Sequence, residues 1–558
     1  MKTLLAVLLS VSPLIALGQE QVTIRVGASQ TKGAFKPVWH YFGYDELNNT
    51  DTKNGRKLIH ELAALSSTPS HIRAHFLLAS GNGKPALKWG STNVYTEDAS
   101  GKPVYNWAIM DQVFDSWVHA GVTPYVEVGF MPEALSSHPQ PYTPHWKPGD
   151  KFNHYALGWT YPPKSYKEWG DLIYHWVEHS IQRYGKAKVE TWNWEVWNEP
   201  NIFYWHGTPQ DYDKLYDYTA AAIKRALPAA RVGGPASTSP RNAHAAAFLK
   251  QFLEHCASGK NYATGGSGAP LDFISFHAKG HPSLVDGHVE MGISAEMKDA
   301  ADGFNIVRSF PKFHNLPVFI SEADPEGCGA CASRVYPANA YRNTSLYPTY
   351  EAVVLKTMLQ LAASRHIHLK GVLTWAFEME NQPYFEGFRD LATNGIDKPV
   401  LNIFRMEGLM RGNLVKAESS GAVPTGSIVN EGVRSRPDVD VLATRSNHDV
   451  SILIWNYQDN DVSATAARID LRISGLPQNA KRVLLRHYRI DKLHSNSYTV
   501  WKQMGSPQNP SPAQYKKLES AGQLQLLASP RWIGERSGSA EVKFALPLES
   551  VSLVKLSW

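Results

Sequence analysis

Hydrophobic positions follow an alternating pattern over most of the chain. From about residue 36 to 413, short apolar runs alternate with longer stretches whose apolar positions recur at helical spacing. Such alternation predicts repeated βα units, and eight of them predict closure into a (β/α)8 TIM barrel. The runs are 38–43, 71–78, 123–130, 189–197, 231–235, 272–277, 317–321 and 371–377, and the helical stretches include 111–120, 166–184, 211–226, 243–256 and 350–364.

After about residue 415 the pattern becomes that of an all-β unit. Strands are predicted at 439–444, 449–457, 467–474, 482–490, 540–546 and 550–558, with a short helix at 512–523. This pattern is typical of a β-sandwich. The alternating segment 21–26 precedes the barrel and is expected to join that unit. We therefore expect an N-terminal strand within 19–35, a barrel over 36–415 and a β-sandwich over 416–558.

The first eighteen residues have the features of a secretory signal. Lys2 precedes an apolar stretch over 4–17, and the small residues Ala16 and Gly18 suit cleavage after Gly18. An uncleaved anchor is the alternative, although the stretch is short for a bilayer. We expect an exported protein, periplasmic or extracellular, with no membrane attachment after cleavage.

Charge and composition exclude one class of function. The formal charge of +5 is spread along the chain without a basic run, so no nucleic-acid partner is expected. Most of the 17 tryptophans are expected in the core, although an aromatic face can also stack on a sugar.

Three cysteines are present. In an oxidising compartment Cys328 and Cys331 are disulfide candidates, with two free thiols or half of a zinc site as alternatives. Zinc would need a further ligand pair, and Cys256 supplies only one more thiol.

Two strand-like runs end in a glutamate, Glu199 in the first and Glu322 in the second. A barrel brings the carboxyl ends of its strands together, so these carboxylates are expected to flank one sugar. Glu199 is the expected acid/base and Glu322 the expected nucleophile. Alone, Glu199 also suits the start of a helix, and the pairing favours catalysis. Glu195 competes with Glu199, but is expected instead to be a structural partner of Arg73.

A metal site is the alternative to this interpretation. His277, His281 and His288 do not have the spacing of a compact zinc motif, and hydrolysis by two carboxylates requires no metal. We expect neither metal nor cofactor.

Several segments together resemble glycoside hydrolase family 39, whose best-known members are β-xylosidases with a (β/α)8 barrel. The resemblance runs from about Val38 to the C-terminus, and the motifs lie at 73–78, 128–135, 161–169, 194–201 and 494–508. It implies a retaining mechanism with Glu199 and Glu322 in the roles given above.

The resemblance also implies a set of sugar-binding residues. His277 matches the family's sugar-binding histidine, Asn198 its asparagine and Trp375 its tryptophan platform, while His75 belongs to the Arg-x-His motif. Phe130 and Tyr204 match aromatic positions beside the sugar. Glu378 and Glu380 compete for the position of a hydroxyl-binding glutamate. Each of these residues also has a simpler interpretation as a packing or supporting residue.

The chain departs from many relatives around the sugar. Lys279 stands where they carry a tyrosine, and it either lowers the pKa of Glu322 or points away. Residues 323–328 replace an aromatic residue and an asparagine. These differences put the identity of the sugar in question more than the reaction.

The sequence therefore predicts an exo-acting xylan 1,4-β-xylosidase that releases xylose from the non-reducing ends of xylo-oligosaccharides. The same machinery acting on an α-L-arabinofuranoside or β-galactoside is the first alternative. A non-catalytic carbohydrate-binding protein and a transglycosylase are the others. The sequence gives no oligomeric state.

Overall fold

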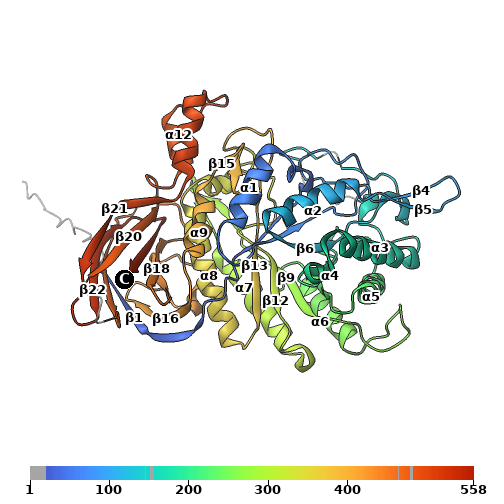
Figure 1. Cartoon of the computed structure of the whole chain (residues 1–558), viewed down its shortest axis with the longest axis horizontal. Coiled ribbons are helices and arrows are strands. Elements are labelled where there is room, and N and C mark those ends of the chain that lie inside the picture. Colours follow the sequence, from blue (N-terminus) through green and yellow to red (C-terminus); the bar gives the residue numbers. More distant parts are fainter. Residues whose placement is uncertain (1–20, 145, 151–155, 463, 478–481) are drawn as a thin grey trace, which may run out of the picture.

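The computed structural model describes residues 21–144, 146–150, 156–462, 464–477 and 482–558. Within them the chain forms a closed parallel barrel and, beside it, a nine-stranded sheet (Figure 1). The predicted signal over 1–18 lies outside the described residues. No helix in the described ranges has both the length and the hydrophobicity needed to cross a bilayer.

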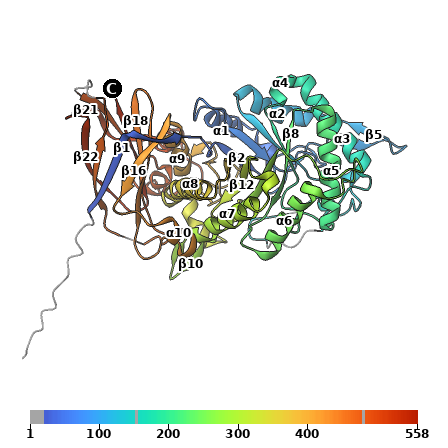
Figure 2. The ribbon, with the colours of Figure 1, turned by 90° about the horizontal axis from the view of Figure 1, so that it is seen from below.

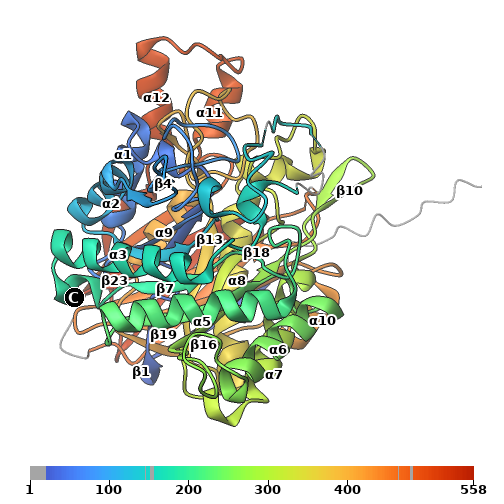
Figure 3. The ribbon, with the colours of Figure 1, turned by 90° about the vertical axis from the view of Figure 1, so that its right-hand side faces the viewer.

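Eight strands close the barrel in the order β12-β13-β2-β3-β6-β7-β8-β9. The predicted TIM barrel is thereby confirmed. Helices α3, α5 and α7 lie against its outer surface (Figure 3). The strands are β2 (Tyr41–Tyr44), β3 (His71–Ala74), β6 (Thr123–Val128), β7 (Asn193–Val196), β8 (Arg231–Ser237), β9 (Phe273–Lys279), β12 (Val318–Asp324) and β13 (Leu369–Trp375).

The helices of the barrel include four that the sequence pattern did not identify, namely α1, α4, α7 and α9. All of them are α1 (Lys53–Ala63), α2 (Ala108–Ala120), α3 (Tyr166–Tyr184), α4 (Lys186–Val189), α5 (Pro209–Ala226), α6 (Ala243–Ser258), α7 (Ile293–Arg308), α8 (Leu346–Ser364) and α9 (Pro399–Gly408). The strand predicted to begin at Val189 was too long, because α4 occupies its first residue and β7 begins at Asn193.

Side chains alternate along the barrel strands between the helices and the barrel axis. In β6, Val126 and Val128 pack in the main core beneath the helices, whereas Tyr125 joins a separate aromatic cluster. Glu127 shares the face of Tyr125 and is paired in register with Glu195 of β7. The strand pattern therefore turns two carboxylates toward the barrel axis.

Three small hairpins decorate the barrel. They are β4 (Tyr95–Glu97) with β5 (Pro103–Tyr105), β10 (Ser283–Val285) with β11 (His288–Glu290), and β14 (Ala392–Thr393) with β15 (Ile396–Asp397).

The second unit is one sheet with the order β21-β20-β23-β18-β17-β16-β1-β19-β22. Its aliphatic core draws on strands near both ends of the sheet, so the sheet folds over its own apolar face. The elements are β1 (Gln21–Ala34), β16 (Asn413–Ser419), β17 (Asp438–Arg445), β18 (Asp449–Tyr457), β19 (Ala467–Ser474), β20 (Arg482–Ile490), β21 (Gln525–Gly534), β22 (Ser539–Leu546) and β23 (Ser550–Ser557), with helices α10 (Thr425–Glu431), α11 (Ser497–Gln503) and α12 (Pro512–Gly522).

The N-terminal strand β1 belongs to this sheet. It pairs antiparallel with β16 and parallel with β19, and Figure 2 shows it crossing to the sheet from the barrel side. Two strands were not predicted, β16 and β21, and β16 begins before residue 416, where the second unit was expected to start.

Candidate active site

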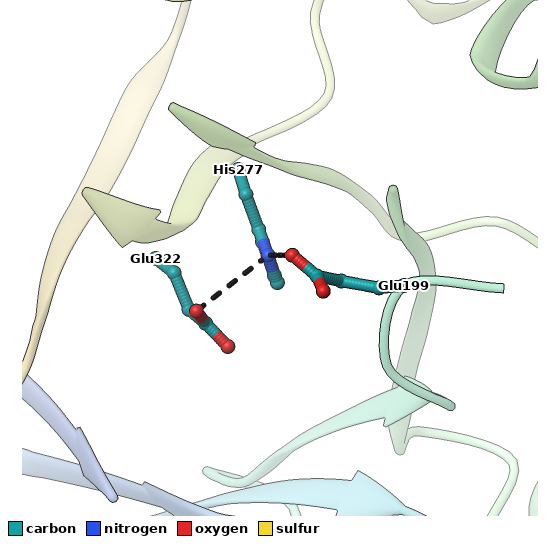
Figure 4. A group of neighbouring side chains, drawn as sticks. All are labelled: Glu199, His277 and Glu322. Carbon is teal, nitrogen blue, oxygen red and sulfur yellow. Dashed lines mark hydrogen bonds and ion pairs between the residues drawn. The ribbon is translucent and has the colours of Figure 1, made fainter. Parts of the chain in front are cut away.

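The carboxylates of Glu199 and Glu322 converge at the carboxyl ends of the barrel strands, on either side of His277 (Figure 4). The Nδ1 atom of His277 lies 2.9 Å from Oε1 of Glu199 and 3.7 Å from Oε2 of Glu322. One ligand atom from each of the three residues lies within 4.8 Å of the others. This spacing suits a retaining glycosidase, whose two carboxyl groups lie about 5 Å apart.

Glu199 is placed by an unusual stretch of backbone after β7. Trp197 and Glu199 both adopt left-handed conformations, with φ of 70° and 45°. Non-glycine residues pay on the order of 1 kcal/mol or more for such torsions, which persist where the surroundings enforce them. Here the backbone N–H of Trp197 donates to Val128 and that of Glu199 donates to Ala236. The neighbouring strands therefore fix the turn that presents Glu199.

Glu322 is held by two permanent cations. Nη1 of Arg73 lies 3.0 Å from Oε1, and Nζ of Lys279 lies 2.7 Å from Oε2. Burial alone would raise the pKa of Glu322, but attraction to His277, Lys279 and Arg73 outweighs it and holds this pKa well below its usual range. Glu322 is therefore ionised, which is the state that its predicted role as nucleophile requires.

Arg73 connects most of the charged groups on the barrel axis. Besides Glu322, it contacts Glu195 at 2.6 Å and Glu127 at 3.0 Å, and it donates to Oδ1 of Asn198 at 2.9 Å. The predicted pairing of Arg73 with Glu195 is thus confirmed. Asn198 directly precedes Glu199 in the chain. Arg73 therefore contacts both Glu322 and the residue next to Glu199.

Comparisons with known proteins agree with this geometry. The model of glycosyl hydrolases family 39 matches residues 22–532. The chain belongs to glycosyl hydrolase family 39. Membership makes it a glycoside hydrolase, and it confirms the resemblance drawn from the motifs.

Relatives in family 39 carry more than one activity in their names. A β-xylosidase of Caldicellulosiruptor saccharolyticus is 28% identical over 75% of this chain and 76% of its own length. The human α-L-iduronidase is also 28% identical, over 69% of this chain and 59% of its own. A solved structure, the monomeric β-xylosidase of Caulobacter crescentus CB15, shares the fold with a TM-score of 0.72, 22% identity and coverage of 96% and 99%.

The predicted aromatic residues line the same site. The rings of Trp375 and His75 lie 4.1 Å apart, and Arg73 lies 5.0 Å over the Trp375 ring. Phe130 stacks on Tyr204 at 5.7 Å and approaches His75 at 5.6 Å. These rings form a wall beside Glu322, although their contacts with a sugar remain predictions.

His75 has carboxylates on both of its ring nitrogens. Nδ1 lies 2.5 Å from Glu127, whereas Nε2 faces Asp45 at 3.2 Å and Glu322 at 3.7 Å. Burial, followed by repulsion from Arg73, lowers the pKa of His75 well below its usual range. The ring is therefore neutral and acts through hydrogen bonds.

Glu378 and Glu380, the two rivals for a hydroxyl-binding role, are engaged elsewhere. Glu378 accepts from the backbone N–H of Gly395 at 2.5 Å, and Glu380 accepts from Asn54 at 2.9 Å. These contacts direct them toward the β14–β15 hairpin and α1. Neither is brought against Glu322 by any contact among the described residues.

Glu199, His277 and Glu322 could in principle hold a metal ion. However, each oxygen of Glu322 already faces a cation, Arg73 on one side and Lys279 on the other. A divalent cation here would meet two positive charges in a buried setting, so the donor set does not fit a metal.

Glu127, Asp45 and Lys88 lie in this region but were not predicted from the sequence. An acidic residue in the middle of a buried strand is a signal that could have identified Glu127. Asp45 directly follows β2, as Glu199 follows β7. Its position after a barrel strand could therefore have identified it as a site residue. Lys88 lies in a loop and has no comparable signal.

The disulfide candidates are joined: Cys328 and Cys331 form a disulfide in the loop after β12. Arg342 donates to the carbonyls of both cysteines and contacts Glu326 at 2.8 Å. The bond thus closes a structural loop after the strand that carries Glu322.

Proposed function

We propose that this hydrolase retains anomeric configuration and releases xylose from the non-reducing ends of β-1,4-xylo-oligosaccharides. The observation that carries the mechanism is the spacing of the two carboxylates, with a pair of oxygens within 4.8 Å. A water molecule cannot be placed between them and the sugar as inversion requires, since inverting carboxyl groups lie about 6.5–9.5 Å apart.

In the first step Glu322 attacks the anomeric carbon, and Glu199 donates its proton to the departing oxygen. The C–O bond to the aglycone breaks as an ester to Glu322 forms. In the second step Glu199 takes a proton from water, and the resulting nucleophile cleaves the ester to release the sugar. Arg73 and Lys279 stabilise the charge on Glu322 at the start and end of the cycle.

The charges around the site favour a neutral sugar. The cations near Glu322 are already paired: Arg73 with three glutamates, and Lys279 with Glu322 and Asp324. Arg389 lies near Asp324 at 3.4 Å and near Glu326 at 3.2 Å. A sugar carboxylate would enter a region where carboxylates outnumber these cations, and it would be repelled. A xyloside has no carboxylate.

A panel of aryl glycosides tests the sugar. The β-xyloside should have a kcat/KM at least about tenfold above those of the α-L-arabinofuranoside, the β-galactoside and the α-L-iduronide, a difference of 1.4 kcal/mol in transition-state binding. A preference for the iduronide would show that the paired cations accept a carboxylate, and the assignment to xylose would be wrong.

Azide tests the roles of the two glutamates. With Glu322→Gly, azide should occupy the vacated space and yield an α-glycosyl azide, because attack comes from the nucleophile's face. With Glu199→Gly, azide should attack the ester instead and yield the β-azide. Identical products from both variants would contradict the assignment.

We also propose that the protein is exported, as its N-terminal sequence predicts. The Cys328–Cys331 disulfide supports this, since such bonds persist in oxidising compartments. Detection in the periplasm or medium, with a mature chain beginning at Gln19, is the expected result. A cytoplasmic chain that retains Met1 would contradict it.

A further inference from the structure

A small cavity of about 20 Å³, with room for about one water molecule, is lined by two oppositely charged side chains. Its lining includes Asp45, Lys88 and the aromatic residues Phe76, Trp159 and Tyr204. None of the catalytic steps above uses Asp45 or Lys88.

Asp45 is connected to the nucleophile through one side chain. Its Oδ1 lies 3.2 Å from Nε2 of His75, and that nitrogen lies 3.7 Å from Oε1 of Glu322. Glu199 instead approaches the opposite oxygen of Glu322, through His277. Asp45 and Glu199 therefore reach the nucleophile from different sides.

Lys88 pairs with the other oxygen of Asp45, and both side chains are at least 90% buried. Lys88 also has a left-handed backbone, with φ of 53°, and its N–H donates to Glu46 at 2.7 Å. A buried ion pair costs desolvation and a non-glycine left-handed torsion costs strain, so this arrangement is not what stability alone would favour.

We propose that Asp45 and Lys88 bind two adjacent hydroxyls of the glycone, at the edge remote from the anomeric carbon, and so determine which sugar is accepted. The carboxylate accepts from one hydroxyl and the ammonium donates to the next. The anomeric carbon must lie between Glu199 and Glu322, so the groups reached through His75 meet the far edge, which carries the 3- and 4-hydroxyls of a xyloside. This inference rests on the proposed hydrolase function and adds its specificity.

The test compares hydroxylated and deoxy substrates in three variants. Wild type, Lys88→Met and Asp45→Asn are assayed on the aryl glycoside that the panel ranks first and on its 3-deoxy and 4-deoxy analogues. In wild type the analogues should lose about 10- to 100-fold more kcat/KM than in the variants, since each lost hydrogen bond to a charged group is worth this much. The ratio between two substrates cancels the fraction of folded enzyme. Comparing that ratio between wild type and each variant cancels the intrinsic reactivity of the deoxy sugars.

Lys356→Met provides the matched control. Lys356 pairs with Asp440, and its side chain is 16% exposed against 10% for Lys88, but this pair joins α8 to β17. The control should lower the melting temperature without changing the deoxy ratios. If Lys88→Met and Asp45→Asn behave like the control and discriminate as wild type does, the pair only anchors the loop and the proposal is wrong. A different first-ranked sugar would instead overturn the proposed xyloside while leaving this comparison intact.

Discussion

The axis of the barrel and the interior of the β-sheet unit differ in the kinds of side chain that they bury. The sheet encloses an aliphatic core, with Val22, Ile452 and Leu471 among its fully buried members. The barrel axis buries ions beside an aromatic cluster, and there Arg73 meets Glu127, Glu195 and Glu322 with none of these side chains more than 7% exposed. Both regions exclude water, but burying the ions of the barrel axis costs desolvation free energy, whereas burying the aliphatic side chains of the sheet does not.

The difference separates stability from function. Burying aliphatic side chains gains roughly 25 cal/mol per Å² of apolar surface. Burying a pair of ions often adds nothing to the net free energy of unfolding. Removing one partner then leaves the other as an uncompensated buried charge. A fold tolerates such a group where its charges act on a substrate. Mutations in the sheet core are therefore expected to lower mainly the stability of the protein. Mutations of the ions on the barrel axis are expected to lower its activity.

The largest effect should come from Arg73→Met. It leaves three glutamates without their shared cation, so we expect kcat/KM to fall more than about 1000-fold and stability to fall by about 3–5 kcal/mol. Steady-state kinetics and urea unfolding measure the two. Activity within tenfold of wild type would show that the comparison between the interiors is wrong.

Leu471→Ala, in the sheet core, should give the opposite pattern. Truncating a fully buried leucine costs about 2–5 kcal/mol of stability. Because β19 lies outside the barrel, kcat and KM of the folded enzyme at 25 °C should stay at wild-type values. A changed kcat would mean that the sheet unit shapes the active site.

Lys279→Met should produce a smaller effect that depends on pH. Removing this cation raises the pKa of Glu322, which must be deprotonated to attack. The acidic limb of the pH profile of kcat/KM should therefore move to higher pH, with a loss of up to about tenfold per pKa unit on that limb and less near neutrality. Lys279→Arg, which keeps the charge, should leave the limb in place. An unmoved limb in Lys279→Met would contradict the electrostatic role.

The smallest effect is expected from Glu296→Gln, in a helix behind the barrel. Burial raises the pKa of Glu296 to about 8, and its carboxyl contacts the hydroxyl of Tyr350 at 2.5 Å. The folded state thus holds a proton that the unfolded state releases above pH 4.5, so this group's contribution to stability falls as pH rises from there to about 8. Unfolding of the variant at pH 6 and 9 should show a flatter pH dependence. A slope equal to that of wild type would exclude Glu296 as its source.

The fold was predictable from sequence where the apolar pattern was strong. All eight barrel strands overlap the predicted runs, because the buried strands are bounded by polar loops. Helix α7 was missed since Glu296 and Asp299 are buried polar residues that interrupt its apolar face. Strand β21 was missed because most of its residues are exposed, so no alternation marks it.

The site was predictable only as far as strand ends reveal it. Glu199 and Glu322 close apolar runs, and the structure brings them together as that position implies. The ion pair of Asp45 and Lys88 joins β2 to a loop 43 residues further on. Such a contact is set by tertiary packing and leaves no periodicity in the sequence.

Strand β1 has a consequence for synthesis on the ribosome. It emerges first, yet its partners β16 and β19 begin at Asn413 and Ala467. At roughly 5–20 residues per second, β1 waits about 20 to 90 seconds for its neighbours. During that time its backbone donors and acceptors are an open edge for other chains. The whole barrel is thus translated before the first strand of the sheet unit can pair, and the chain passes between the two units both before and after the barrel.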